Sequence, residues 1–172
     1  MTSRRSSVVA IMPMTVDDWP DVRRIYAEGI ATGDATLERE APDWNHFDHS
    51  HPTDCRLVAR QAGEIVGWTA INGYSARKVY SGVAWESVYV ASEARGRGIG
   101  RSLLEALIPA TDAIGIWTLL AGVLIDNRPS LRLHRRVGFR RVGVQRRMGQ
   151  DATGRWRDIV LLERRSEVSG LD

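Results

Sequence analysis

The sequence predicts a single α/β domain built on a mixed sheet. The first observation is the order of the expected elements, which runs strand, helix, two or three strands, then strand, helix, strand. The second is the length of 172 residues, 43% of them hydrophobic and 26% charged, which suits one ordinary globular domain. The short first helix and the central hairpin argue against a regular doubly wound fold. We assign residues 1–165 to the domain and residues 166–172 to a loose, flexible tail.

A buried strand over residues 8–12 begins the pattern, and a capped helix follows it. Thr15 and Asp18 have the spacing of a helix-capping pair, and apolar residues then recur at helical spacing. Residues 31–54 are polar and irregular, and a loop of this length in a compact domain is often functional. A short helix fits near residues 43–47.

The middle of the chain predicts a hairpin, a further strand and an amphipathic helix. Residues 56–60 and 65–71 have strand patterns separated by a tight turn. After a second loop, residues 83–90 predict a strand and residues 100–113 a helix with an apolar face. Because proline lacks the N–H that a helix needs, we expect Pro109 to kink or end this helix.

The last third predicts a buried strand, a helix and a hairpin. Residues 117–125 are almost continuously apolar, as in a strand covered on both faces. Asp126 or Asn127 can cap the next helix, because both side chains accept hydrogen bonds from free N–H groups. The final hairpin pairs residues 139–147 with residues 155–162.

Composition excludes several classes of protein. The net charge is only +3, and the basic residues are dispersed, which argues against a nucleic-acid binder. Lys78 is the only lysine among 24 basic residues, and arginine suits forked recognition of phosphate or carboxylate. Cys55 is the only cysteine, so no disulfide within the chain or cysteine zinc cluster forms. With no apolar run near the roughly 18 residues of a membrane span, we expect a soluble cytoplasmic protein.

The run Arg95-Gly96-Arg97-Gly98-Ile99-Gly100 lies between an expected strand and an expected helix. Glycines allow backbone N–H groups to face a ligand, and a helix N-terminus adds a positive field, so the run fits a pyrophosphate site. A solvated arginine-glycine turn is the other interpretation of the spacing. The run is neither a Walker loop, which needs G-x-x-x-x-G-K-[ST], nor the dinucleotide fingerprint G-x-G-x-x-G.

These residues resemble the signature [QR]-x-x-G-x-[GA] of the GCN5-related N-acetyltransferases (GNAT). The order of strands, helices and hairpin is similar over nearly the whole chain. More narrowly, the chain resembles the phosphinothricin and methionine sulfoximine acetyltransferases. Three further segments are similar to that subfamily at matching distances: "ESVYV" (86–90), "NRPSLRLHRRVGF" (127–139) and "GRWRDIVLLER" (154–164).

The resemblance implies the GNAT fold, a mixed and mostly antiparallel sheet flanked by helices. It also implies acetyl-CoA as the donor, a primary amine as the acceptor, no metal, and a homodimer. Similar enzymes hold the pantetheine arm along one strand backbone, the pyrophosphate at the glycine turn, and a further part of the cofactor near the next helix. The corresponding residues here are Val88, Tyr89, Val90, Arg95, Gly96, Arg97, Gly98, Ile99, Gly100, Arg101, Asn127 and Ser130.

Glu86 is the candidate general base. On a strand, residues 86, 88 and 90 share one face, so Glu86 lies on the face of Val88 and Val90. A carboxylate in apolar surroundings can accept a proton near neutral pH, and an ammonium acceptor must lose one before it attacks a thioester. A structural ion pair with an arginine is the alternative, and the resemblance favours the base.

His134 is the second titratable candidate, since it matches a histidine of the subfamily. It could polarise the acceptor or help the thiolate leave, whereas a packed structural histidine is the alternative. A tyrosine often protonates the departing thiolate in this superfamily, and no matching tyrosine follows Asn127.

The acceptor site is expected in two loops. An amino-acid substrate needs a cation for its carboxylate, and the loop with Arg77, Lys78 and Tyr80 supplies one. Ala76 stands where the subfamily has a bulky aromatic residue, so the size of the substrate stays open. Thr36 lies in the other loop.

The spacing of His46, His49 and His51 fits no metal-binding pair on one helix, so we expect a polar loop near the acceptor and no metal.

The leading hypothesis is therefore N-acetylation of a small amino acid or analogue, with a role in antibiotic or herbicide resistance. Backbone N–H groups near Val88 are expected to stabilise the oxyanion. Acetylation of another amine (a protein N-terminus, a polyamine or an aminoglycoside) is the alternative enzyme function. A CoA-binding sensor without activity is the non-enzymatic alternative.

Overall fold

The strands form one continuous sheet. The computed structural model describes residues 8–171, and within them the sheet has seven strands in the order β1-β2-β3-β4-β5-β7-β6. Neighbouring strands are antiparallel except β4 and β5, which are parallel. The prediction of a mixed, mostly antiparallel sheet is confirmed. The strands are β1 (Ala10–Pro13), β2 (Arg56–Gln61), β3 (Glu64–Gly73), β4 (Val83–Val90), β5 (Thr118–Leu124), β6 (Arg140–Gln150) and β7 (Trp156–Arg165).

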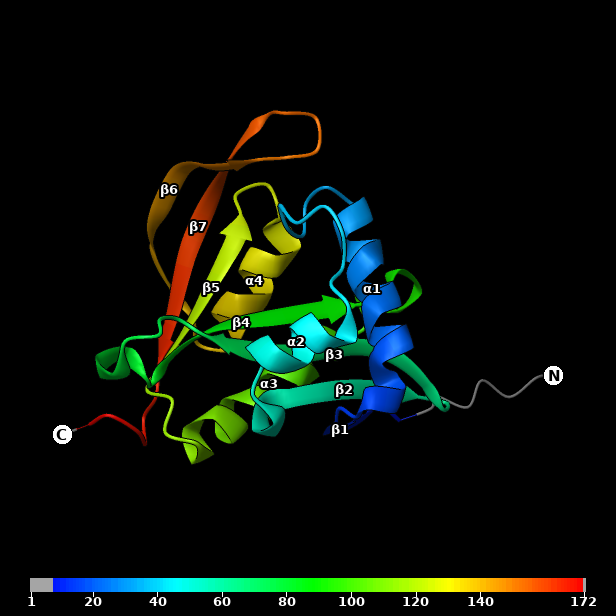
Figure 1. Cartoon of the computed structure of the whole chain (residues 1–172), viewed down its shortest axis with the longest axis horizontal. Coiled ribbons are helices and arrows are strands. Elements are labelled where there is room, and N and C mark those ends of the chain that lie inside the picture. The colour runs from blue at the N-terminus through cyan, green and yellow to red at the C-terminus, as the bar shows by residue number, and fades with distance from the viewer. Residues whose placement is uncertain (1–7, 172) are drawn as a thin grey trace.

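Helices cover both faces of this sheet (Figure 1). On one face, Gly29 of α1 packs directly on the ring of Tyr89 in β4. On the other, Gly100 of α3 contacts Val90 of β4 and Leu133 of α4. The helices are α1 (Trp19–Ala31), α2 (Trp44–Ser50), α3 (Ile99–Ala113) and α4 (Arg128–Arg136), with 3-10 turns η1 (Val16–Asp18), η2 (Thr53–Cys55), η3 (Lys78–Tyr80) and η4 (Ser92–Ala94).

Local signals in the sequence account for most element ends. The Thr15 N–H donates to Asp18 Oδ2 at 2.8 Å before α1, as the capping pair predicts. The hairpin between β2 and β3 turns through Ala62 and Gly63, both at positive φ. Asn127 is the residue that caps α4, because its side chain accepts from Ser130 N.

The predicted helix over residues 100–113 is present, and it does not end at Pro109. α3 continues through this proline to Ala113. Leu107 and Thr111 on either side of it are buried against the sheet, and the Thr111 hydroxyl donates to Ile108 O at 2.7 Å. Packing of the flanking residues therefore keeps the helical path although one backbone hydrogen bond is lost.

The parallel strands β4 and β5 separate part of the way along their length. In the described chain their pairing runs from Val83 with Thr118 to Trp85 with Leu120, while β5 stays paired with β7 as far as Leu124. Figure 1 shows the two strands diverging from there. Glu86 is thus the first residue of β4 beyond the paired part, and its strand edge faces the opening.

The end of the described chain lies against α3. The Ser166 hydroxyl donates to Asp112 Oδ1 at 2.6 Å, and the Ser169 hydroxyl donates to Asp112 O at 3.1 Å. The first residues of the expected tail therefore contact α3. The flexibility of residues 166–172 stays a prediction. Within residues 8–171, no helix is both long and apolar enough to cross a membrane.

Candidate active site

The arginine-glycine turn forms the entry to α3. Gly96 and Gly98 have φ of 75° and 83°, and a side chain at either position would meet nothing within 4 Å. Glycine is therefore needed here for its backbone conformation. The first bond of α3 runs from Ser102 N to Gly98 O, so the N–H groups of residues 99–101 have no partner inside the helix. They form a positive helix end of the kind that binds phosphate.

The side chains of this turn divide into two groups. Arg95, Arg97 and Arg101 are exposed; Arg95 Nε donates to Val90 O, and Arg101 Nε lies 2.7 Å from Glu105 Oε1. Ile99, in contrast, is buried in the core and contributes only its backbone to the surface. Exposed cations beside free N–H groups have the chemistry that a pyrophosphate requires.

The edge of β4 presents backbone groups to the opening. Ala91 N donates to Val66 O in β3, and backbone groups alternate between the two sides of a strand. The N–H and C=O groups of Glu86, Val88 and Val90 consequently point away from β3, toward the side on which β5 has separated. Val88 is therefore placed to hydrogen-bond an extended ligand arm.

Tyr89 has a different environment from Val88. Its ring lies between Tyr26, at 4.7 Å, and Trp68, at 4.8 Å, with Thr36 nearby. Burial raises the pKa of Tyr89 well above its ordinary value. Its phenol thus stays protonated, and Tyr89 faces the core under α1.

Glu86 and His134 are brought together across the sheet and α4. His134 Nε2 lies 2.6 Å from Glu86 Oε1, and the two side chains are 2% and 3% exposed. His134 Nδ1 lies 2.7 Å from Ser130 O, and because a carbonyl only accepts, Nδ1 carries a proton. One further proton lies between Nε2 and Oε1.

The charge of this pair follows from its surroundings. Burial lowers the pKa of His134, but the neighbouring Glu86 carboxylate and the Ser130 carbonyl raise it, so that the pKa lies above its ordinary value. The imidazolium form of His134 is thereby favoured.

Glu86 Oε2 is buried and has no hydrogen-bond partner among the described residues. Leaving a buried polar atom unsatisfied costs about 1–3 kcal/mol, and more for a charged one. Glu86 begins the part of β4 that β5 does not pair, and a donor that reached Oε2 would satisfy this buried oxygen.

Asn127 and Ser130 support the start of α4. Asn127 Oδ1 accepts from Ser130 N at 3.2 Å, and Asn127 Nδ2 donates to Asp34 O at 3.0 Å. The Ser130 hydroxyl lies 3.3 Å from His134 Nδ1. Both residues predicted to touch the cofactor thus also hold the helix that carries His134.

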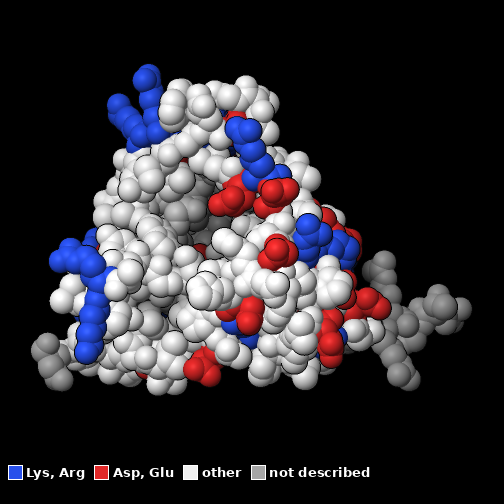
Figure 2. Space-filling model, in the orientation of Figure 1, with Lys and Arg blue, Asp and Glu red and all other residues white. Residues whose placement is uncertain are grey.

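The two predicted acceptor loops lie on different parts of the molecule. Arg77, Lys78 and Tyr80 are exposed around η3, with the Arg77 guanidinium 5.2 Å from the Tyr80 ring centre. Thr36 is half-buried against Tyr89. Figure 2 shows a hollow on this face above β4, with basic side chains to its left and acidic side chains along its right rim.

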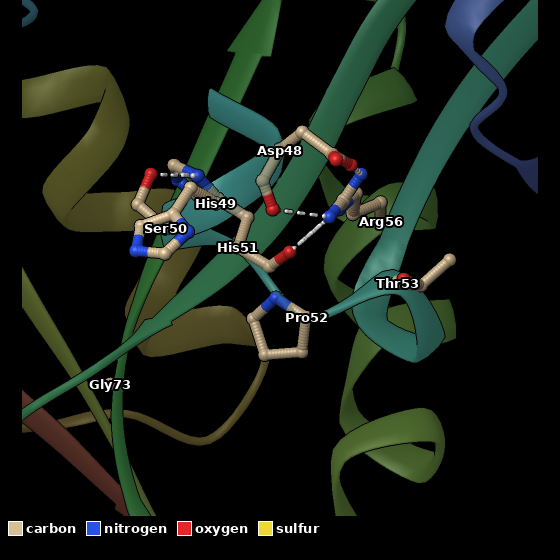
Figure 3. A pocket seen from close by; sticks show the side chains of 8 residues that line it. All are labelled: Asp48, His49, Ser50, His51, Pro52, Thr53, Arg56 and Gly73. Atoms are coloured by element: carbon tan, nitrogen blue, oxygen red, sulfur yellow. Dashed lines mark hydrogen bonds and ion pairs between the residues drawn. The ribbon is translucent and has the colours of Figure 1, made fainter. Parts of the chain in front are cut away.

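The expected polar loop is largely helical, since His46 and His49 lie on α2 and His51 follows its end, next to Arg56. A pocket of about 380 Å³ lies here, lined by residues from Asp48 to Thr53 together with Arg56 and Gly73 (Figure 3). Arg56 Nη1 donates to Asp48 Oδ1 at 2.6 Å, and Nε donates to His51 O at 2.8 Å, so the guanidinium closes the end of α2. Within residues 8–171, no group of three or more His, Cys, Asp or Glu side chains is placed to hold a metal ion.

The sequence reasoning missed Arg157, whose side chain is 7% exposed and lies beside three carboxylates near Asn127. Its one sequence signal is the position within "GRWRDIVLLER", where a charged residue begins an apolar strand.

Comparison with known proteins assigns the chain to a protein family. A model of the acetyltransferase (GNAT) family matches residues 15–139. Phosphinothricin N-acetyltransferase of Alcaligenes faecalis is 35% identical over 159 residues, which cover 86% of this chain and 78% of that protein. L-methionine sulfoximine/L-methionine sulfone acetyltransferase of Pseudomonas aeruginosa is 31% identical over 154 residues, covering 86% and 89%.

A solved structure is also similar. The GNAT superfamily phosphinothricin acetyltransferase of Sinorhizobium meliloti, in complex with AcCoA, has a TM-score of 0.86 and 26% identity. The match covers 95% of this chain and 91% of that one. With the family model matching across the glycine turn and both candidate proton-handling residues, the chain belongs to the acetyltransferase (GNAT) family and is an acyltransferase.

Proposed function

We propose that this protein transfers an acetyl group from acetyl-CoA to the primary amine of a small amino acid or analogue, of the phosphinothricin, methionine sulfoximine or methionine sulfone type. The observation that carries the proposal is the buried, unpartnered Glu86 Oε2 at the opening between β4 and β5. The names of the relatives at 35% and 31% identity support the class of acceptor.

The donor side uses backbone groups and arginines. The chain fits acetyl-CoA because the N–H groups at the start of α3 and the exposed Arg95, Arg97 and Arg101 suit a pyrophosphate. The outward-facing N–H and C=O of Val88 suit the amides of a pantetheine arm. Acetyl-CoA supplies the activated acetyl group as a thioester. An N–H at the β4 edge is placed to stabilise negative charge on the acetyl oxygen.

The proton from the acceptor ammonium goes to Glu86. Oε2 is the acceptor atom, either directly or through a water molecule, because Oε1 is engaged by His134. Both ring nitrogens of His134 are engaged, one by Glu86 and one by Ser130 O. We therefore assign His134 to holding and polarising Glu86, and the proton for the departing thiolate comes from another group.

Recognition of the acceptor carboxylate is assigned to Arg77. Its guanidinium is exposed and lies over the Tyr80 ring, next to Lys78 in the sequence. Because Ala76 is small, the site has room for a side chain larger than the subfamily pattern allows. Thr36 bounds the site from the other loop.

The relatives also suggest the setting of the activity. We propose a cytoplasmic homodimer that inactivates an amino-acid antibiotic or herbicide. The outer strand β6 supports a dimer, since it ends the sheet and exposes Val142 and Met148.

A panel of amines tests the function, with acetyl-CoA as donor and detection of free thiol. It contains phosphinothricin, methionine sulfoximine, methionine sulfone, ordinary amino acids, a polyamine, an aminoglycoside and a peptide. The highest kcat/KM is expected for one of the first three compounds. A higher kcat/KM for a polyamine, aminoglycoside or peptide would show that the acceptor is not a small amino acid or analogue. If acetyl-CoA binds but no amine releases free thiol, the protein would instead be a CoA-binding sensor.

Arg77→Gln refines the same experiment. A hydrogen bond to a charged group contributes about 1.5–3 kcal/mol, so the KM for an amino acid should rise about 10- to 100-fold. The KM for the matching amine without a carboxylate should stay the same. An equal rise in KM for both acceptors would show that Arg77 does not recognise the carboxylate.

A further inference from the structure

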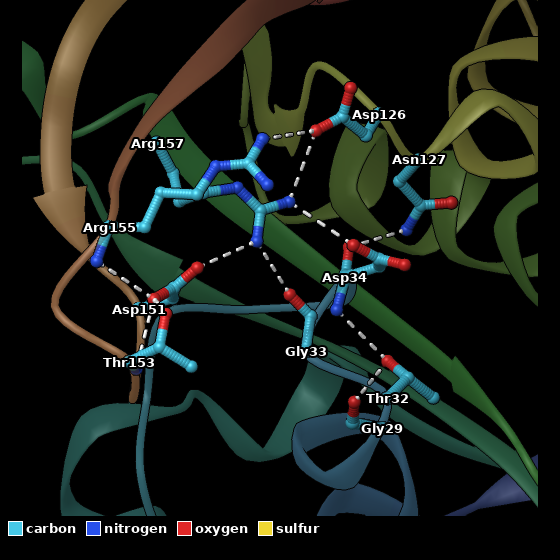
Figure 4. A network of polar contacts seen from close by, with 10 residues as sticks. All are labelled: Gly29, Thr32, Gly33, Asp34, Asp126, Asn127, Asp151, Thr153, Arg155 and Arg157. Carbon is cyan, nitrogen blue, oxygen red and sulfur yellow. Dashed lines mark hydrogen bonds and ion pairs between the residues drawn. The ribbon is translucent and has the colours of Figure 1, made fainter.

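Arg157 joins three segments that are distant in the sequence. Its Nη1 donates to Gly33 O at 3.0 Å and to Asp151 Oδ2 at 3.3 Å. Its Nη2 donates to Asp34 Oδ1 at 3.1 Å and to Asp126 Oδ2 at 3.4 Å. The loop after α1, the turn between β5 and α4, and the β6–β7 hairpin thus meet on one guanidinium (Figure 4).

The charges make this junction depend on Arg157. Three carboxylates surround a guanidinium that is 7% exposed, and the second cation nearby, Arg155, is 68% exposed and lies 3.6 Å from Asp126. A hydrogen bond from Thr153, with further bonds from Arg155 and Arg157, lowers the pKa of Asp151 to about 2, so this carboxylate stays ionised. Without Arg157, the carboxylates would repel one another across the junction.

The junction continues into the proposed site. Asn127 Nδ2 donates to Asp34 O, and Asn127 Oδ1 caps α4 through Ser130 N. Ser130 O in turn accepts from His134, which holds Glu86. A chain of polar contacts therefore runs from Arg157 through the loop after α1 to the candidate base.

The same loop is pressed onto its neighbours at two further points. Leu37 covers Gly149 of β6, where an added Cβ would lie 2.7 Å from Leu37 Cδ1. Thr36 lies beside Tyr89 of β4. Residues 33–37 thus contact the β6–β7 hairpin at both of their ends, through Arg157 and Gly149, and form a wall beside β4.

We propose that Arg157 is a positioning residue, which clamps residues 33–37 against the start of α4 and so fixes the acceptor-side wall together with Asn127. The proposal rests on the acetyltransfer function proposed above. Arg157 touches neither substrate; it acts through Asp34 and Asp126. It couples the acceptor loop to the helix that holds His134, so both halves of the site depend on one guanidinium.

The test compares Arg157→Met with Arg155→Met and Arg157→Lys. Arg155→Met is the matched control, since it removes an exposed cation from the same hairpin and leaves the backbone N–H that donates to Asp151. We expect Arg157→Met to raise the acceptor KM about 10- to 100-fold, because small misplacements in a site have effects of this size. Arg155→Met should change it less than about twofold, and Arg157→Lys should fall between the two.

A double-mutant cycle separates positioning from a general loss of stability. If Arg157 acts through Asp34, Arg157→Met and Asp34→Ala together should raise the acceptor KM little more than either change alone. Independent multiplication of the two effects would overturn the proposal. The thermal midpoint is measured for every variant. The kinetic assays are run well below the lowest midpoint, so that every variant is folded during the assay.

Amide hydrogen exchange keeps this result separate from the proposed function. Arg157→Met should speed exchange of the amides in residues 33–37, and Arg155→Met should leave them unchanged. Unchanged exchange in Arg157→Met would overturn the clamp, and faster exchange without a change in acceptor KM would overturn its role in the site. If the wild-type protein acetylated none of the amines, the proposed function would fail, and exchange alone would decide whether Arg157 holds the loop.

Discussion

The glycine turn and the Glu86–His134 pair differ in how they are built. The turn is a run of consecutive residues, 95–101, on the surface, and it offers mainly backbone N–H groups. The pair joins residues 48 positions apart, on β4 and α4, and both side chains are nearly completely buried. One region depends on local conformation, and the other depends on the packing of the sheet against α4.

This difference teaches what each region tolerates. Backbone donors keep their geometry as long as the turn keeps its positive φ values, whatever side chains surround it. A buried carboxylate and imidazole depend on distance, desolvation and the state of each other. Changes at the pair should therefore alter the chemical step, whereas changes at the turn should alter cofactor binding.

Glu86→Gln is expected to have the largest effect. The amide keeps the shape but cannot accept the ammonium proton, so kcat should fall about 10²- to 10⁴-fold with little change in the KM for acetyl-CoA. Steady-state kinetics across pH measure this, with Glu64→Gln in the exposed β2–β3 hairpin as the control. An unchanged kcat and pH profile would show that Glu86 is not the base.

Gly98→Ala should have an intermediate effect, confined to the turn. A side chain at φ of 83° adds about 1–2 kcal/mol of strain, and relief of that strain would rotate the N–H groups away from the phosphates. We expect the KM for acetyl-CoA to rise about fivefold or more at an unchanged kcat.

Gly115→Ala is the matched control, because Gly115 has φ of 81° and similarly open surroundings after the other end of α3. Both variants should lose comparable stability. An equal rise in the KM for acetyl-CoA in the two variants would show that the turn has no specific role in cofactor binding.

The smallest effect concerns the pH dependence of stability. The pKa of His134 is raised in the folded state above its ordinary 6.5, so its contribution is complete below that pH and is lost as pH rises through the folded pKa. As pH rises above about 6.5, the thermal midpoint of the wild-type protein should fall more steeply than that of His134→Gln, by about 2–4 °C for each kcal/mol lost. Parallel curves would mean that the pair contributes no pH-dependent stability.

Local patterns predicted the elements more successfully than the contacts between them. The capping pair at Thr15, the hairpin at Ala62-Gly63 and the cap at Asn127 were recognisable because each involves residues within a few positions. That the helix continues past Pro109 could not be decided locally, because burial of its neighbours, a tertiary effect, outweighs the loss of one hydrogen bond.

The contact between Glu86 and His134 could not be derived from periodicity, which gave only the face of each side chain. The resemblance to acetyltransferases named both residues, but their 2.6 Å separation and the free Oε2 come from the packing of α4 on the sheet. The position of Arg157 at the start of an apolar strand did not reveal its partners, because they lie in three segments that meet only in the folded chain.

The sequence by itself determined the α/β class, the order of the elements, the turn before α3 and the identity of the two titratable side chains. Each of these depends on interactions over a few residues or on a motif of consecutive residues. The folded structure was needed to show where β4 parts from β5, which Glu86 oxygen lacks a partner among the described residues, and which arginine contacts the loop after α1. These depend on distances between segments far apart in the chain, which are set when the whole sheet and its helices pack together.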